Sequence, residues 1–239
     1  MFFRKAVLVV HGFSSGTWEN EYLINYLKYY DDLDVYAFTL PGHCKEVVEK
    51  VKYQEWIDAS EKELKKLISK YKTIYIVGHS MGGVIATYLA SKYKEVKKLV
   101  LLAPSFEYLN IKQNADDFKK LKFKSKYEEE IYKELFPKLF QIPISVINEF
   151  RKLVKEYKKR TLDIACDTLI LYGEADELIP YKSIEYAYET ISSKQKHVTI
   201  IKDVKHRILI SNRKEEVSKY ISDYLKGGRR WKLAKKSEL

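Results

Sequence analysis

The sequence predicts an α/β fold, with a mostly parallel sheet of about six strands and helices on both faces of the sheet. Short apolar runs rich in Val, Ile and Leu alternate along the chain with longer amphipathic segments, the pattern of repeated strand–helix–strand units. The chain has 239 residues, of which 46% are hydrophobic, enough to bury the core of one such domain. One Gly-rich turn, residues 78–83, joins a strand-like run directly to a helix-like run.

Apolar, β-branched runs predict each strand, and the segments between them have the helical spacing of apolar residues. We expect strands over 6–10, 34–38, 73–77, 97–102, 168–172 and 197–202. We expect helices over about 19–30, 53–70, 82–93, 181–191 and 213–226. Strands that are joined by right-handed helical crossovers run parallel, so all of these strands are expected to end at the same edge of the sheet.

The turn at residues 78–83 reads Gly-His-Ser-Met-Gly-Gly and contains the pattern G-x-S-x-G. Such a turn is so tight that a Cβ two residues before or after Ser80 would meet the neighbouring backbone. The Ser80 hydroxyl is thereby held clear of its own main chain, above a helix N-terminus that favours developing negative charge. Ser80 is therefore the candidate nucleophile, and the alternative is an ordinary Gly-rich turn before a helix.

A nucleophilic serine needs a base to take its proton and an acid to orient that base. Of the five histidines, His79 diverges from the nucleophile in the turn, while His11 and His43 each lie beside a glycine and are expected to shape loops. His197 follows charged residues at the start of a strand. His206 lies just past the last predicted strand, where the catalytic side chains of an open parallel sheet gather. Elimination makes His206 the candidate base.

The acid is expected after the strand at 168–172, where three carboxylates compete. Asp176 is preferred because its short side chain suits a fixed hydrogen bond to an imidazole. Glu174 and Glu177 are interpreted as solvated loop charges. Asp203 is a rival that lies beside the base's own loop.

The strand at 6–10 runs into His-Gly-Phe-Ser-Ser-Gly at 11–16, a loop of small residues that can offer a free backbone N–H. We expect the N–H groups of Phe13 and Met81 to form an oxyanion hole with two donors. Such a hole stabilises the negative charge that develops when a hydroxyl attacks a carbonyl.

Together these residues resemble the α/β-hydrolase superfamily, in particular its small carboxylesterases and monoacylglycerol-lipase-like serine hydrolases. The resemblance covers residues 3–225 and rests on the order Ser80, Asp176, His206, on His-Gly-Phe at 11–13, on Leu-Pro-Gly-His at 40–43 and on Gly-x-x-Asp-x-x-Ile-Pro at 173–180. Two positions depart from the family pattern, since Cys44 and Lys205 stand where glycine is usual. The two leading antiparallel strands common in the family are expected to be absent.

The resemblance implies a serine carboxylesterase that works through an acyl-enzyme intermediate and needs no metal or organic cofactor. The expected substrates are small-molecule esters with medium-chain acyl or aryl groups, with monoacylglycerols as a further candidate. The same three residues would also serve a thioesterase, a C–C hydrolase or an acyltransferase or perhydrolase. A non-catalytic, hydrolase-like binding protein is the alternative from another class, and the intact set of residues speaks against it.

Residues 105–166 interrupt the strand–helix alternation with helical patches at 128–140 and 144–158 and with scattered aromatic residues. The family inserts a cap (lid) at this place, so the resemblance implies a helical cap whose apolar face lines the acyl pocket. The alternative is that these helices bury their aromatic side chains on the sheet and do not touch substrate. The expected parts are a hydrolase core over 1–104 and 167–226, a cap over 105–166 and a basic C-terminal tail over 227–239.

The formal net charge is +11, and residues 226–239 contribute six basic side chains beside Trp231. A solvated tail is the favoured interpretation, and weak attraction to an anionic lipid surface is the alternative. The sequence contains no nucleic-acid-binding module, so nucleic acid is not an expected partner. The two cysteines suggest no disulfide framework, and no run is long enough to span a membrane, so we expect a cytoplasmic protein.

Overall fold

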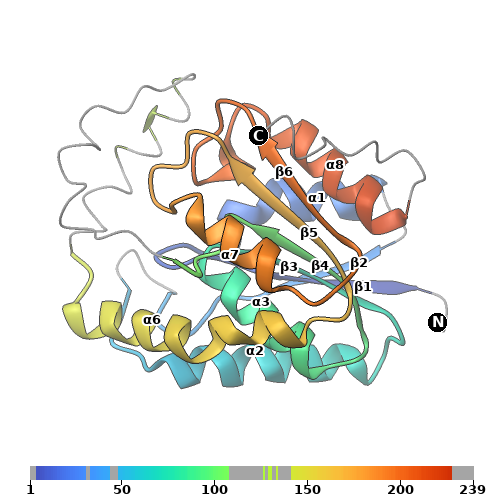
Figure 1. Cartoon of the computed structure of the whole chain (residues 1–239), viewed down its shortest axis with the longest axis horizontal. Coiled ribbons are helices and arrows are strands. Elements are labelled where there is room, and N and C mark those ends of the chain that lie inside the picture. Colours follow the sequence, from blue (N-terminus) through green and yellow to red (C-terminus); the bar gives the residue numbers. More distant parts are fainter. Residues whose placement is uncertain are drawn as a thin grey trace.

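The centre of the molecule is a parallel sheet of six strands in the order β2-β1-β3-β4-β5-β6 (Figure 1). The computed structural model describes residues 4–30, 33–43, 48–107 and 141–227, with the isolated positions 126, 129, 130 and 133. The strands are β1 (Lys5–Val10), β2 (Leu33–Ala37), β3 (Ile74–His79), β4 (Val96–Leu102), β5 (Asp167–Gly173) and β6 (Lys196–Ile201). The predicted α/β fold is confirmed, and each predicted strand lies within two residues of its expected bounds.

The path of the chain from strand to strand decides which face of the sheet each helix covers. From β1 the chain moves outward to β2, then crosses back to β3 and continues in the opposite direction to β6. Because such crossovers are right-handed, the helix of the first crossover lies on one face and the later ones lie on the other. Figure 1 shows α1 (Glu21–Tyr30) and α8 (Lys214–Lys226) together on one face, opposite α2 (Tyr53–Ile68), α3 (Met81–Lys92), α6 (Ile144–Tyr157) and α7 (Lys182–Thr190).

The direction in which the chain moves along the sheet reverses between the neighbouring strands β1 and β3. The connections after these two neighbouring strands leave in opposite directions, and ligands of open α/β sheets bind at such a point. The loop at residues 11–16 follows β1, and the turn at residues 78–83 follows β3. The topology therefore brings the two motifs found in the sequence to one place.

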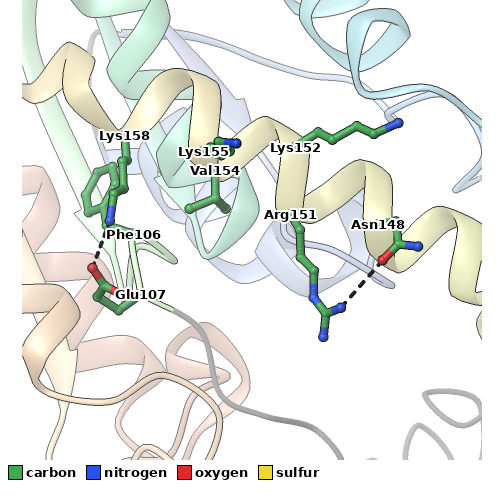
Figure 2. A pocket seen from close by; sticks show the side chains of 8 residues that line it. All are labelled: Phe106, Glu107, Asn148, Arg151, Lys152, Val154, Lys155 and Lys158. Atoms are coloured by element: carbon green, nitrogen blue, oxygen red, sulfur yellow. Dashed lines mark hydrogen bonds and ion pairs between the residues drawn. The ribbon is translucent and has the colours of Figure 1, made fainter.

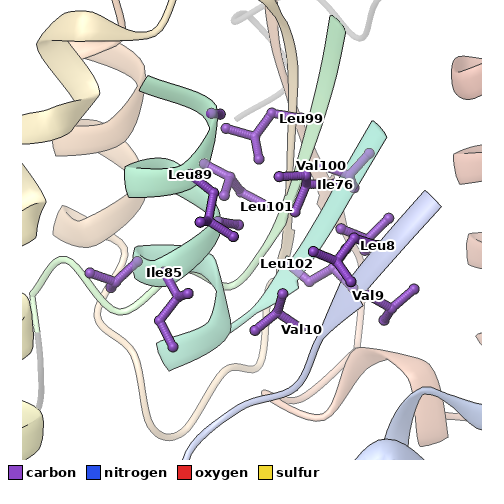
Figure 3. Packing of buried hydrophobic residues seen from close by; sticks show 14 of the residues in the cluster. Leu8, Val9, Val10, Ile76, Ile85, Leu89, Leu99, Val100, Leu101 and Leu102 are labelled. Atoms are coloured by element: carbon purple, nitrogen blue, oxygen red, sulfur yellow. The ribbon is translucent and has the colours of Figure 1, made fainter. Parts of the chain in front are cut away.

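Apolar side chains fill both sides of the sheet. All six residues of β3 are buried, which is typical of a parallel strand covered on both faces. Leu89 of α3 and Leu101 of β4 both belong to this core (Figure 3), and both side chains are fully buried. Because α3 is buried over most of its surface, the turn that precedes it is anchored to a rigid element.

One predicted helix is divided in the structure. The segment expected to be helical over about 19–30 begins with a 3₁₀ turn, η1 (Thr17–Asn20), before α1. The polar side chains of Glu19 and Asn20 are buried in this turn. The turn therefore points two polar residues inward, where the amphipathic pattern predicted an ordinary first turn of helix.

Of the predicted cap, the structure describes mainly the second half. The helix expected over 144–158 is α6, which packs against α2 and α3 and is followed by the 3₁₀ turn η2 (Lys158–Asp163). Apart from isolated positions, the helix expected over 128–140 lies outside the described residues, as do Cys44 and the tail beyond Gly227. The division into core, cap and tail stays a prediction.

Among the described helices, none is long and apolar enough to cross a bilayer.

Candidate active site

Ser80 lies at the sharp turn between β3 and α3 and has a backbone conformation that few residues adopt. Its φ is 54° and its ψ is −118°, a conformation that costs a non-glycine residue about 1–3 kcal/mol. Three backbone hydrogen bonds hold it there: Ser80 N donates to Leu102 O (2.9 Å), and Ser80 O accepts from Gly83 N (2.9 Å) and Ser105 N (3.3 Å). The Ser80 side chain is thereby fixed at the N-terminus of α3, at the carboxyl edge of the sheet.

Gly78 and Gly82 flank this turn and leave no room for a side chain. A Cβ on Gly78 would overlap the carbonyl oxygen of Gly82, and a Cβ on Gly82 would overlap the carbonyl oxygen of Val10. Both obstacles belong to the backbone and cannot swing aside as a flexible side chain would. The tightness of the turn into α3 therefore requires glycine at position 78, and the close approach of α3 to the end of β1 requires it at position 82.

Asp176 and His206 come from the loops after β5 and β6 and are hydrogen-bonded to each other. The distance from His206 Nδ1 to Asp176 Oδ2 is 2.9 Å, and both side chains are buried. Asp176 Oδ1 accepts hydrogen bonds from the N–H groups of Leu178 (2.9 Å) and Ile179 (2.8 Å). Burial by itself lowers the pKa of His206, but the Asp176 carboxylate raises that pKa above its ordinary value. The acid therefore holds Nδ1 and leaves Nε2 for a proton from another group.

The other two acids of this loop bind backbone groups. Glu177 Oε2 accepts a hydrogen bond from His206 N (3.1 Å), and Glu174 Oε2 accepts one from Asp203 N (3.2 Å). Glu177 is partly buried and binds the backbone of the base's loop, a contact that the prediction of a solvated loop charge did not include. The base's loop packs against the loop after β5, so a backbone N–H there needs an acceptor from the protein.

His11 and His43 shape loops, as expected. His11 Nε2 accepts a hydrogen bond from Leu40 N (2.9 Å), and His11 Nδ1 donates one to Gly12 O (2.8 Å). His43 Nδ1 donates a hydrogen bond to Pro41 O (3.0 Å). Burial lowers the pKa of His11 to about 4, so this ring is neutral at ordinary pH.

The Ser80 hydroxyl is paired with a serine that the sequence analysis missed. Ser80 Oγ lies 2.9 Å from Ser105 Oγ, and Ser105 is fully buried. Within the described residues, no hydrogen bond joins Ser80 to His206. His79 connects the Ser80 turn to the loop of His206. Its Nε2 donates to His206 O (3.1 Å), and its ring centroid is 4.9 Å from that of His206. A signal for Ser105 did exist, since residues 103–105 directly follow a strand that ends beside β3.

The loops that carry Phe13 and Met81 border Ser80. A Cβ on Gly12 would lie 3.1 Å from Ser80 Cβ, so the loop after β1 approaches the turn closely. Met81 is the first residue of α3, where a backbone N–H has no partner inside the helix. In the described part of the chain, neither the Phe13 N–H nor the Met81 N–H donates a hydrogen bond. Both groups are available as oxyanion donors, and that role stays a prediction.

A buried ion pair lies beside this group of residues and was also missed. Glu19 Oε2 of η1 is 2.8 Å from Nη1 of Arg207, the residue directly after the candidate base. These two residues are 188 positions apart, so no local pattern in the sequence could have predicted their contact.

A cavity of about 500 Å³ lies between α6 and the residues that follow β4 (Figure 2). Its lining is basic: Lys158 pairs with Glu107 across it (2.9 Å), and Arg151 is hydrogen-bonded to Asn148 (3.5 Å). The proposed catalytic side chains do not line it, so it differs from the apolar acyl pocket expected under the cap. The residues described as lining it are Phe106, Glu107, Asn148, Arg151, Lys152, Val154, Lys155 and Lys158.

Two protein-family models match the chain. Residues 5–141 match the model described as the alpha/beta hydrolase fold, which therefore spans more than half of the chain. Residues 124–213 match the model described as serine aminopeptidase, S33.

Individual relatives and solved structures are similar over most of their length. The thermostable monoacylglycerol lipase of a Bacillus species is 24% identical over 212 residues, covering 84% of this chain and 82% of that protein. A Mycoplasma pneumoniae protein with an esterase/lipase name is 26% identical over 210 residues, covering 75% of this chain and 71% of that protein. The crystal structure of the Paleococcus ferrophilus monoacylglycerol lipase has a TM-score of 0.70 and 20% identity, covering 92% of this chain and 93% of that chain. At that identity, the structural likeness shows the fold.

Proposed function

Because the chain belongs to the α/β-hydrolase family, we propose that it is a serine hydrolase of carboxylic esters with the catalytic triad Ser80, His206 and Asp176. The observation that carries this proposal is the buried His206–Asp176 hydrogen bond of 2.9 Å, at the same edge of the sheet as the strained Ser80 turn. Strain of this kind persists only where the surrounding structure enforces it, and it gathers at functional sites. The esterase and lipase names of the relatives support the class of bond that is cleaved.

In the proposed reaction, Ser80 Oγ attacks the ester carbonyl while His206 Nε2 takes the serine proton. Asp176 keeps the imidazole in the correct tautomer and stabilises the imidazolium that forms. The N–H groups of Phe13 and Met81 donate to the oxyanion at the N-terminus of α3. His206 then gives the proton to the leaving alcohol, and a water activated by His206 releases the acid from the acyl-enzyme.

The hydrogen bond between Ser80 and Ser105 represents the resting state in this proposal. Rotation of the Ser80 side chain about χ1 exchanges Ser105 for His206 as its partner. Hydrogen bonds between catalytic groups often tighten only when substrate is bound, so the resting geometry is compatible with the reaction.

Medium-chain or aryl esters, with monoacylglycerols as a further candidate, are the proposed substrates. The Phe13 ring stacks on Phe150 of α6 (5.2 Å between centroids) and meets the edge of Trp56 (6.0 Å). This aromatic cluster provides apolar surface next to a proposed oxyanion donor. The name of the Bacillus relative supports glycerol as one alcohol group.

Labelling with a fluorophosphonate, together with hydrolysis of p-nitrophenyl butyrate, tests the proposal. The wild-type protein is expected to be labelled at Ser80 and to hydrolyse the ester, and Ser80→Ala is expected to lose the label and about 10³-fold or more in kcat. Ser69→Ala, at the exposed end of α2, is the matched control and is expected to retain both. A folded wild-type protein that neither reacts with the probe nor cleaves esters contradicts the proposal.

A further inference from the structure

Glu19 and Arg207 form an ion pair with almost no access to solvent. Their side chains are 1% and 6% exposed, and Glu19 Oε2 is 2.8 Å from Arg207 Nη1. Ser15 Oγ donates to the same carboxylate oxygen, and the Arg207 guanidinium lies over the Trp18 ring, 5.8 Å from its centroid. Burial by itself raises the pKa of Glu19, but Arg207 and His79 hold that pKa at about 2. The carboxylate is therefore charged at any working pH.

The Glu19 carboxylate lies among three of the four segments that carry the proposed catalytic groups; the fourth is the loop of Asp176. Glu19 itself lies in η1, directly after the proposed oxyanion loop. Its Oε1 is 3.1 Å from Nδ1 of His79, the residue before the nucleophile. Its partner Arg207 is the residue after the base. The hydrogen bond from His79 Nε2 to His206 O (3.1 Å) closes this set of contacts.

Stability alone is a weak explanation for such a pair. Both charges lose their hydration on burial, and replacing a buried ion pair by apolar residues is often neutral or stabilising. The position of the pair is more informative, because the chain reads Lys-His-Arg around the base and both flanking cations are buried. A histidine between two buried cations loses basicity unless anions lie nearby.

We infer that Glu19 is a positioning residue of the proposed hydrolase: through its ion pair with Arg207 it holds the loop of His206 in place beside the Ser80 turn, and it balances the positive charge beside the His206 ring. This inference rests on the proposed function, because it concerns the same base. The charges that act on the His206 ring are Asp176 and Glu177 from the loop after β5 and Glu19 from η1. The His79 ring, at the end of β3, lies against the His206 ring, and Lys205 and Arg207 flank His206 in its own loop.

Removing one charge of the Glu19–Arg207 pair at a time is expected to shift the pKa of His206, in opposite directions for the two residues. Glu19→Gln removes an anion and lowers the pKa of His206, whereas Arg207→Gln removes a cation and raises it. Because His206 must be neutral to accept a proton, the acidic limb of kcat/KM against pH follows this pKa. The limb is expected to move down by about one pH unit in Glu19→Gln and up by about one in Arg207→Gln, the order of magnitude expected for one nearby charge that the protein screens in part.

The double variant Glu19→Gln/Arg207→Met separates positioning from charge. It contains no unpaired buried charge and is expected to remain folded, which thermal unfolding checks. Its acidic limb is expected near that of the wild type, and its kcat for p-nitrophenyl butyrate is expected to fall about tenfold with KM unchanged, because the loop of the base is no longer held.

The matched control is the double variant Arg213→Gln/Glu216→Gln. It removes an arginine–glutamate pair of 2.7 Å that lies largely exposed at the start of α8, and it is expected to keep the wild-type pH profile and kcat. The inference stands if the limbs of the single variants move in opposite directions and the Glu19→Gln/Arg207→Met variant loses kcat. Any other result with folded variants overturns it.

If the single variants do not fold, the inference is tested by the kcat of the Glu19→Gln/Arg207→Met variant alone. A lowered kcat supports the inference, and a wild-type kcat overturns it. A wild-type protein without esterase activity refutes the proposed function instead, so the two failures are distinguishable.

Discussion

At the scale of single residues, the geometry of one loop separates three similar acids. Asp176, Glu174 and Glu177 lie within four positions, yet of these only Asp176 is hydrogen-bonded to the His206 ring. Two backbone N–H groups fix the other oxygen of Asp176, so its short side chain cannot turn away. Glu177 binds the backbone of His206, and therefore supports the loop; it acts on the imidazole only through its charge, which helps to raise the pKa of His206.

Asp176→Asn is expected to lower kcat for p-nitrophenyl butyrate by about 10³-fold, because an amide cannot stabilise the imidazolium or enforce the tautomer. Circular dichroism is expected to show an unchanged fold. Glu174→Gln, in the same loop, is the control and is expected to retain wild-type activity. If Glu174→Gln lost kcat and Asp176→Asn kept it, the acid of the triad would be Glu174 and not Asp176.

Ser105→Ala is expected to raise the rate of labelling by a fluorophosphonate. The Ser80–Ser105 hydrogen bond competes with the productive bond from Ser80 to His206, and one neutral hydrogen bond is worth about 0.5–1.5 kcal/mol, or about 2–10-fold in rate. The second-order rate constant of labelling measures the effect. A slower reaction in Ser105→Ala would show that Ser105 assists the nucleophile and does not restrain it.

At the scale of elements, α6 is tied to the hydrolase core by contacts close to the proposed oxyanion loop. Glu149 Oε2 accepts a hydrogen bond from Tyr53 N at the start of α2 (3.1 Å). One position later, Phe150 stacks on Phe13 with 15° between the ring planes. The described part of the predicted cap therefore supports the loop that carries one of the proposed oxyanion donors.

Phe150→Ala is expected to lower kcat for p-nitrophenyl acetate about tenfold, because loss of the stacked ring lets the Phe13 N–H move away from the oxyanion. The short acetyl group limits any contribution from acyl-chain binding. Ile144→Ala, at the exposed start of the same helix, is the control and is expected to change nothing. Equal kcat values for Phe150→Ala and the wild type would show that α6 does not position the oxyanion loop.

At the scale of the whole molecule, the strand order decides where the chemistry can happen. Ser80, Asp176 and His206 follow three different strands, and all three strands end at one edge because every neighbouring pair is parallel. The reversal of direction between β1 and β3 lies at this edge, which is where open α/β sheets bind ligands. A cap over residues 105–166 would cover this edge and define how much of an acyl chain is buried.

The dependence of kcat/KM on acyl-chain length tests the cap. If its aromatic residues line an acyl pocket, each added methylene is expected to contribute about 0.8 kcal/mol, or about fourfold, until the pocket is full. A series of p-nitrophenyl esters from acetate to decanoate measures this profile. A flat profile would mean that the aromatic residues pack on the sheet alone, and the proposed esterase activity would still stand.

Much of the fold could be predicted from the sequence, because its signals are local. Runs such as 74–77 and 97–102 are apolar and β-branched over a few residues, so each predicts a strand by itself. The tight turn around Ser80 follows from the steric needs of its own glycines. The order of strand ends then places Ser80, Asp176 and His206 at one edge, and the structure shows the bond between the last two.

The sequence alone therefore determined the strands, the Ser80 turn and the candidate triad, since each depends on residues that are close in the chain or on the common edge of a parallel sheet. Only the tertiary structure decided that Ser105 pairs with Ser80, that Glu177 binds the backbone of His206, and that Glu19 is buried against Arg207. These contacts join loops separated by 25 to 188 residues. A side-chain hydrogen bond forms only within about 3 Å and a narrow range of angles, so it depends on how the loops pack. The sequence indicates at most that two loops end near each other, as it does for residues 103–105 and the Ser80 turn, and not which side chains pair.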